Sequence, residues 1–144
     1  MPDTPADAGP PLKPPSPGVL DKYQGDEVRP LYTGRVRVSG GVAGHGRASG
    51  VAVSDDGALA LDLRLPPALG GPGGGSNPEQ LLGAGYAACF HGAMMLLAAR
   101  AGLMLVDACI DVGVTFSRDP IDGLYLLSAE GDGYLPGLES GEAG

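Results

Sequence analysis

The stretch that decides the fold is residues 77–100, NPEQLLGAGYAACFHGAMMLLAAR. Asn77 can cap the first free amides of a helix, Pro78 suits the first helical position, and Gln80 completes a capping box. Gly102 supplies a stop, because glycine commonly follows the last helical turn. The sequence therefore predicts one helix of about 24 residues, roughly 36 Å long at about 1.5 Å per residue.

This helix carries no charged residue between positions 81 and 99, so it is apolar on every side. Such a helix has to be enclosed by protein or by lipid. Three glycines, a tyrosine and a histidine interrupt the apolar run, and alternating strand patterns rather than a basic loop follow it. The sequence favours a buried helix in a protein core, with a membrane span at 81–99 as the alternative.

On both sides of the helix, apolar and polar residues alternate as they do in strands. The predicted strands are residues 32–39, 58–65, 110–116 and 124–130, the predicted turns are 55–57 and 118–123, and the predicted loops are 40–50 and 70–75. The glycine run at 70–75 lacks the Lys and Ser/Thr of a phosphate-binding loop, so its glycines are expected to permit close backbone approach. One helix among antiparallel strands is typical of the α+β class.

Composition bounds the remaining possibilities. The chain has 144 residues with 26 glycines and 14 prolines, which indicates one modest domain with a small core. A net charge of -8 without a basic cluster argues against nucleic-acid binding. The two cysteines form neither a CxxC motif nor a Cys/His cluster, so no disulfide framework and no metal site are expected. Residues 1–29 predict a disordered, proline-rich extension without a secretory signal, and hence a cytoplasmic protein.

Several blocks of sequence occur in a distinctive order and spacing. They are LYT at 31–33, SDDG at 54–57, LGG with a glycine run from 69, NPEQL at 77–81, AGYAACFHGA at 84–93, DPIDG at 119–123 and LPGLE at 135–139. In these blocks the chain resembles the organic hydroperoxide resistance (Ohr) proteins of the OsmC superfamily. The resemblance implies a bacterial thiol peroxidase of α+β fold, in which antiparallel sheet packs around a long buried central helix within an intertwined homodimer.

The resemblance also implies the site residues. Cys89 is expected to be the peroxidatic cysteine, Arg47 in GHGRASG the arginine that holds its thiolate, and Glu79 in NPEQL the carboxylate that holds that arginine. Arg35 and Arg37 remain alternatives for the arginine. No cofactor is implied, and the expected reductant is an external dithiol such as the lipoyl group of a lipoylated protein.

The pKa of a thiol gives an independent reason to expect a cation near Cys89. A free thiol has a pKa of about 8.5, and burial in an apolar helix raises it further. Cys89 lies twelve residues after the helix start, where the dipole no longer helps, and roughly 16 Å along the axis from Arg100. The loop at 40–50 can deliver only His45 and Arg47, so it is the natural source of the cation.

Two further residues on the helix have geometric constraints. His91 lies about 200° around the axis from Cys89, so it is expected to face away from the thiol, and a role as general base is a minor alternative. Glu79 lies ten residues before Cys89, about 15 Å along the axis, so one arginine cannot touch both on one straight helix. We therefore hypothesise that the second chain of a homodimer contributes Arg47 and Glu79.

The chain also departs from the family it resembles. Those proteins carry a resolving cysteine in a CPYS-type motif on a later helix, whereas ESGEAG stands at 139–144, so the domain at 30–144 is expected to lack that helix and a final strand. Cys109 belongs to a predicted strand and is expected to be a structural residue, with resolution as a minor alternative. Exposed apolar surface is expected unless an oligomer covers it. A truncated, non-catalytic relative is therefore the alternative to an active peroxidase in the oxidative stress response.

Overall fold

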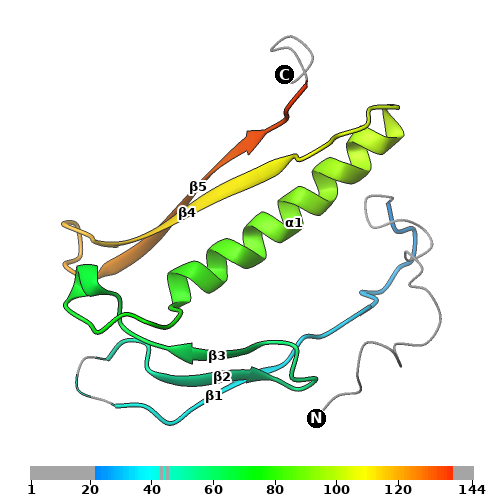
Figure 1. The fold of residues 1–144 in the computed structure, drawn as a ribbon. Helices are drawn as coiled ribbons and strands as arrows, with labels where there is room; N and C mark the ends of the chain where they lie inside the picture. The colour runs from blue at the N-terminus through cyan, green and yellow to red at the C-terminus, as the bar shows by residue number, and fades with distance from the viewer. Residues whose placement is uncertain (1–21, 43, 45, 138–144) are drawn as a thin grey trace. The chain divides into compact units, whose positions relative to one another are not determined.

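The structure, a computed structural model, describes residues 22–42, 44 and 46–137. Its elements are β1 (Val36–Ser39), β2 (Gly50–Ser54), β3 (Ala60–Leu63), the short 3-10 helix η2 (Pro67–Leu69), α1 (Pro78–Arg100), β4 (Cys109–Arg118) and β5 (Tyr125–Tyr134) (Figure 1). The chain divides into two compact units between Ser76 and Asn77. The predicted α+β class is confirmed, whereas His45, most of the proline-rich extension and the end of the LPGLE block lie outside the described residues.

The first unit contains a three-stranded antiparallel sheet in the order β1-β2-β3. Its buried apolar residues are Ala52 in β2 and Leu63 in β3. The turn predicted at 55–57 joins β2 to β3, where the Gly57 N–H donates to the Ser54 carbonyl at 3.0 Å. The carboxylate of Asp56 accepts hydrogen bonds from the Ala58 N–H and the Ser54 hydroxyl, and these two donors lower the pKa of Asp56. The ionised carboxylate therefore helps to close the hairpin.

Strand β2 was not predicted from the sequence. Its GVAVS segment follows a glycine-rich loop and begins with a glycine, which hides its short alternation. The two predicted neighbours are also shorter than expected, since β1 covers only 36–39 of the predicted 32–39 and β3 only 60–63 of 58–65. Beyond Leu63 the backbone pairs with the segment that precedes α1, because the Arg64 N–H donates to the Ser76 carbonyl at 2.9 Å.

The glycine run before α1 has the structural role expected for it. A side chain at Gly71 would collide with the carbonyl oxygen of Leu65, and the Gly73 N–H donates to that same carbonyl at 3.0 Å. The glycines therefore allow the loop to lie directly against the backbone that leaves β3, as the sequence predicted.

The second unit is built on α1, which begins and ends close to where the sequence placed it. The Asn77 side chain accepts a hydrogen bond from the Gln80 N–H at 2.9 Å, and only 7% of Asn77 is exposed. Pro78 occupies the first helical turn, the helix ends at Arg100, and Gly102 adopts a left-handed conformation with φ 76°. The predicted cap and stop are both confirmed.

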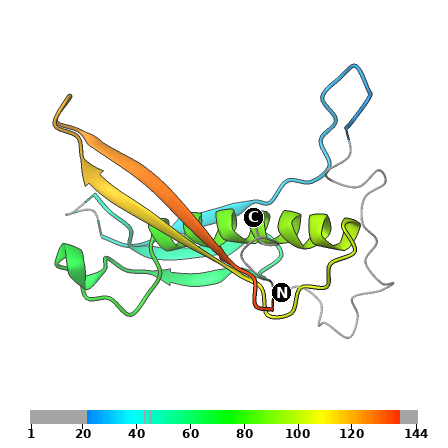
Figure 2. The ribbon, with the colours of Figure 1, turned by 90° about the horizontal axis from the view of Figure 1, so that it is seen from above.

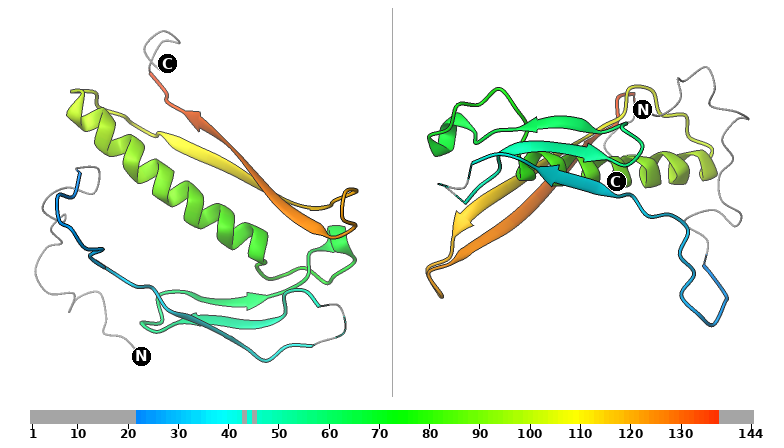
Figure 3. Two further views of the ribbon diagram at one scale, coloured as in Figure 1. Left: turned by 180° about the vertical axis from the view of Figure 1, so that it is seen from behind. Right: turned by 90° about the horizontal axis from the view of Figure 1, so that it is seen from below.

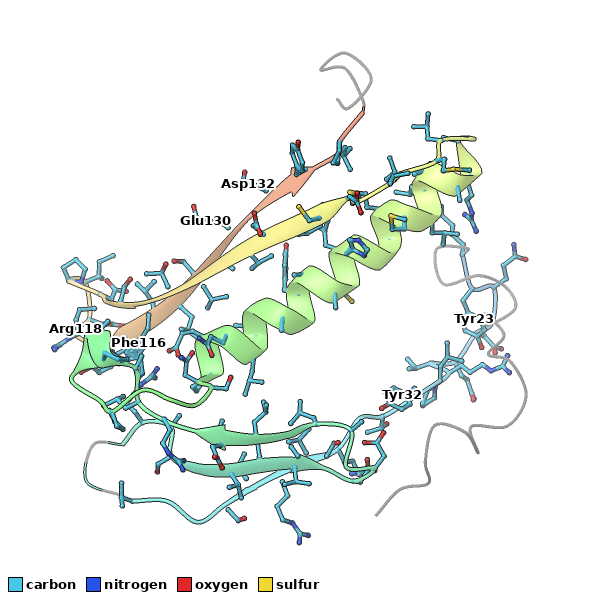
Figure 4. All side chains as sticks on the ribbon, in the orientation of Figure 1. Tyr23, Tyr32, Phe116, Arg118, Glu130 and Asp132 are labelled. Carbon is cyan, nitrogen blue, oxygen red and sulfur yellow. The ribbon has the colours of Figure 1, made fainter. Side chains whose placement is uncertain are left out.

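A long antiparallel hairpin, β4–β5, packs on this helix. Its register runs from Cys109↔Tyr134 to Arg118↔Tyr125, and the predicted turn at 118–123 joins the strands. Seen from above, the hairpin crosses the axis of α1 obliquely (Figure 2). Gly83 is buried against β4, and a Cβ there would make an ordinary van der Waals contact of 3.6 Å with Cγ2 of Val114. Glu130 and Asp132 lie on the side of the hairpin that faces away from α1 (Figure 4).

Strand β5 extends four residues past the predicted end at residue 130. The two glycines in this extension obscured the strand pattern. They are placed opposite large residues, since Gly131 pairs with Val112 and Gly133 with Ile110. A Cβ on Gly133 would lie 3.2 Å from Cδ1 of Ile110, so the larger partner fills the space that the glycine leaves. The extended pairing is thus stabilised by side chains of the opposite strand.

Within the second unit, the β4–β5 hairpin packs on one side of α1 (Figure 3). Within the helix, Gly83 and Ala98 are the buried residues. By length and composition α1 could also span a membrane, and 6% of its most apolar 18-residue window is buried. The second unit by itself therefore leaves apolar surface of α1 exposed, and the full enclosure of the helix requires something beyond this unit.

The Asn77 cap provides a test of how much the helix start contributes to stability. We expect Asn77→Ala to lower the free energy of unfolding by about 1 kcal/mol, within a range of about 0.5–2 kcal/mol, because the Gln80 N–H loses its acceptor. Urea denaturation followed by circular dichroism measures this change. Asn77→Asp keeps the acceptor and should retain stability, whereas equal loss in both variants would contradict a capping role.

Candidate functional site

Cys89 lies in the middle of α1 and its side chain is exposed. Neither Cys89 nor Cys109 forms a disulfide. Cys109 begins β4 on the polar face of the hairpin, opposite Tyr134, so it is a strand residue as predicted. The two thiols therefore differ in setting, since one stands on an apolar helix and the other on the solvent-facing side of a hairpin.

The helix face that packs on the hairpin is not the face that carries Cys89. Tyr86 and Phe90 line a hollow of about 100 Å³ together with Ile110, Val112, Gly131, Asp132 and Gly133. His91 is half-buried, and its Nε2 lies 3.1 Å from the carbonyl oxygen of Ala108. Because Cys89 lies about 200° around the helix from His91, the thiol points away from the hairpin. The prediction for His91 is confirmed.

Glu79 occupies the first turn of the same helix and is half-buried. Since α1 is continuous from Pro78 to Arg100, Glu79 and Cys89 lie about 15 Å apart along its axis. An acidic residue in a first helical turn is also favourable for the helix dipole. Glu79 and Cys89 therefore lie on the same continuous helix but are too far apart to contact each other.

Arg47 belongs to the first unit, in the loop between β1 and β2. It is half-buried, and its Nε atom is buried. The ends of this loop are joined by the side chain of Ser49, whose Oγ accepts from the Val42 N–H and donates to the Val42 carbonyl, both at 3.0 Å. Arg47 therefore belongs to a different unit from Cys89 and Glu79.

Sequence reasoning missed Ser49 and Arg64. The Arg64 guanidinium donates from Nη1 to the carbonyls of Leu63 at 2.7 Å and Gly50 at 3.2 Å, and its Nη2 lies 3.9 Å from a carboxylate oxygen of Asp62. These bonds join residues up to fourteen positions apart, so no local sequence motif predicts them. For Ser49, the available sequence signal was a hydroxyl side chain within a glycine-rich loop.

The alternative arginines occupy a different position. Arg35 and Arg37 are exposed and line an open hollow of about 520 Å³ on β1 and β2, with Val36, Val53, Ser54 and Asp55. Arg35 directly precedes β1 and Arg37 is the second residue of that strand, whereas Arg47 belongs to the loop that follows it. Within the described ranges, no group of three or more His, Cys, Asp or Glu side chains could hold a metal ion.

Known proteins resemble this chain in both sequence and structure. It is 42% identical over 114 residues to the organic hydroperoxide resistance protein of Xanthomonas axonopodis pv. citri, covering 78% of this chain and 75% of that protein. The crystal structure of an organic hydroperoxide resistance protein OsmC from Legionella pneumophila matches with a TM-score of 0.67 at 37% identity, covering 80% of this chain and 79% of the other. The OhrB structure of Bacillus subtilis matches with a TM-score of 0.65 at 34% identity, covering 79% of each chain. No protein-family model matches the chain.

The orientation of His91 leads to a prediction about Cys89. In a Cys109→Ser background, we expect His91→Ala to change the rate of Cys89 alkylation by iodoacetamide less than about twofold, because the imidazole lies on the other side of the helix. Rates are measured by mass spectrometry at neutral pH. A loss of reactivity of about a hundredfold, the size expected for a general base, would contradict this geometry.

Proposed function

This chain belongs to the organic hydroperoxide resistance family of the OsmC superfamily and acts in resistance to organic hydroperoxides, and we propose that it does so as an enzyme whose reactive thiol is Cys89. The observation that carries the proposal is the exposed cysteine at the middle of a helix whose only charged residues, Glu79 and Arg100, stand at its two ends. No Asp, Glu, Lys or Arg competes with it on the helix between positions 81 and 99. Its reactivity is therefore governed by groups that reach it from elsewhere.

In the proposed reaction, the Cys89 thiolate attacks the distal oxygen of an organic hydroperoxide. An S–O bond forms, the O–O bond breaks, and the alkoxide leaves and takes up a proton to become the alcohol. Sulfur is oxidised by two electrons to sulfenic acid, and the peroxide is reduced by the same two electrons. The products are one alcohol and Cys89 sulfenic acid.

Arg47 and Glu79 have supporting roles in this proposal. The guanidinium of Arg47 stabilises the Cys89 thiolate and the negative charge that develops on the leaving oxygen. Arginine suits this task because its charge is permanent and its donors are arranged as a planar fork. The carboxylate of Glu79 orients the guanidinium through charge-assisted hydrogen bonds.

The sulfenic acid has to be reduced before a second turnover. We assign this step to an external dithiol, such as a lipoyl group carried by another protein. One thiol displaces water from the sulfenic acid to form a mixed disulfide, and the second thiol then releases Cys89 as a thiol and leaves a cyclic disulfide. Cys109 is not used in this scheme, because it begins a strand on the polar face of the hairpin.

The exposure of α1 within the second unit supports the proposal of a homodimer. The described residues bury only Ala52, Leu63 and Ala98 as apolar side chains, whereas Leu82 and Leu97 of α1 are half exposed or more. A second copy that covers this surface removes apolar area from water. The same copy is the source that we propose for Arg47 and Glu79, since Glu79 of one chain lies about 15 Å along the helix from its own Cys89.

Whether protein or lipid covers α1 also determines where in the cell the protein is located. Although α1 meets the length and composition of a membrane span, the family resemblance favours a core helix in a soluble protein. We therefore propose a cytoplasmic dimer in which a second copy, rather than lipid, covers α1. Fractionation that leaves the protein in the membrane pellet would favour the alternative of a span at 81–99.

The catalytic proposal is tested by replacing Cys89. We expect Cys89→Ser to abolish dithiol-dependent consumption of cumene hydroperoxide, because the alcohol cannot form the sulfenic acid. Reduction of peroxide by dihydrolipoamide, followed spectrophotometrically, measures this loss. Cys109→Ser is the matched control and should keep the rate within about twofold of the wild-type rate.

A wild-type rate equal to that of Cys89→Ser would instead support the non-catalytic alternative. In that case the protein would retain the fold of the family without turnover. The outcome separates the two functions directly, because both variants remove one thiol and only one of them removes the proposed nucleophile.

The sharing of the site between chains is tested by mixing inactive variants. Cys89→Ser and Arg47→Ala are co-expressed with different tags, and mixed dimers should contain one intact site. Dimers that carry both tags should show about half of the wild-type activity per dimer, because one of their two sites is intact. The measurement is peroxide consumption by dimers purified through both tags in sequence.

Arg47→Ala mixed with Glu79→Ala is the matched control. Both substitutions lie in the part that one chain contributes, so no intact site forms and activity stays low. Full activity in a protein that sedimentation shows to be monomeric would refute the shared site.

A further inference from the structure

The loop between β1 and β2 is closed at its base by a single side chain. Ser49 accepts from the Val42 N–H and donates to the Val42 carbonyl, each at 3.0 Å, so one hydroxyl satisfies both backbone groups of one residue. The bonds span seven positions of the chain. They hold together the two sides of the segment that carries Arg47.

Two glycines are needed for this closure. Gly41 has φ 88°, and a Cβ there would collide with the Ser49 hydroxyl. Gly50 has φ 89°, and a Cβ there would collide with the Ser39 carbonyl. Both conformations are costly for other residues, so the glycines allow the two sides of the loop to approach within hydrogen-bonding distance of Ser49.

Arg64 fixes one side of the loop base to the sheet. Its Nη1 donates to the Gly50 carbonyl at 3.2 Å and to the Leu63 carbonyl at 2.7 Å, and these two residues also pair across β2 and β3. Gly50, the residue after Ser49, is therefore held against the sheet. The hydrogen bonds of the Ser49 hydroxyl in turn hold Val42 next to this segment. Arg47 lies two residues before Ser49 and three before Gly50, and it is itself half-buried.

We propose that Ser49 is a positioning residue for Arg47, an inference that rests on the proposed role of Arg47 toward the Cys89 thiolate. Ser49 itself does not touch the reacting atoms. It restricts the backbone on either side of Arg47, so that less conformational entropy is lost when the guanidinium meets the thiolate. A loop with an open base would present the same charge in fewer productive orientations.

The test compares Ser49→Ala with Ser49→Thr, which keeps a hydroxyl, and with Ser128→Ala, which removes an exposed serine on β5. All variants carry Cys109→Ser and are checked by thermal unfolding. The readouts are the pH midpoint of Cys89 alkylation by iodoacetamide and kcat/KM for cumene hydroperoxide. The same Ser49 substitution is also made in an Arg47→Ala background.

We expect Ser49→Ala to move the alkylation midpoint to higher pH and to lower kcat/KM by about three- to tenfold, the effect of losing a hydrogen bond of ordinary strength. Ser49→Thr should restore both quantities, and Ser128→Ala should change neither. In the Arg47→Ala background, removal of the Ser49 hydroxyl should have no further effect, because the residue that it positions is absent.

The inference is overturned if Ser49→Ala behaves as wild type while Arg47→Ala shifts the midpoint. It is also overturned if the Ser49 substitution lowers kcat/KM equally in both backgrounds, since that result would indicate a general loss of structure. If Arg47→Ala itself leaves the midpoint unchanged, the proposed role of Arg47 fails, and the role of Ser49 fails with it.

Discussion

The absence of charge along α1 is the constraint on which the rest of the structure depends. A 23-residue helix with no charged side chain between positions 81 and 99 is stable in water only where other apolar groups cover it. The β4–β5 hairpin covers one side, where Gly83 of the helix is buried against β4. The hairpin does not cover the side that carries Cys89, and the homodimer proposed above covers that same side.

Local signals in the sequence were sufficient for the helix and the turns. The cap at Asn77, the stop at Gly102 and the Asp-Gly turns each depend on residues within about six positions of one another. The strands were harder to predict because pairing is a long-range property. In β5, Gly131 and Gly133 contribute no apolar side chain, and their place in the strand is determined by Val112 and Ile110 on the opposite strand.

The candidate site was only partly predictable for the same reason. Helical periodicity alone separates the Cys89 face from the His91 face, and the hydrogen bond of His91 to Ala108 agrees with that separation. Arg47 could not be identified by periodicity, because a glycine-rich loop has none, and its assignment depended on the family resemblance. The bonds of Ser49 and Arg64 link residues seven and fourteen positions apart and became visible only in three dimensions.

The role proposed for Arg47 depends on local charge rather than on the net charge of the chain. The chain carries a net charge of -8, which as a whole disfavours another anion. Salt at physiological strength, however, screens exposed charges beyond about 8 Å. A guanidinium about 4 Å from a thiolate contributes on the order of 4 kcal/mol at an effective dielectric constant of about 20. One well-held arginine therefore outweighs the excess of distant carboxylates. Because this attraction depends on distance and orientation, the few hydrogen bonds that close an arginine-bearing loop have more influence on reactivity than the overall composition of the chain.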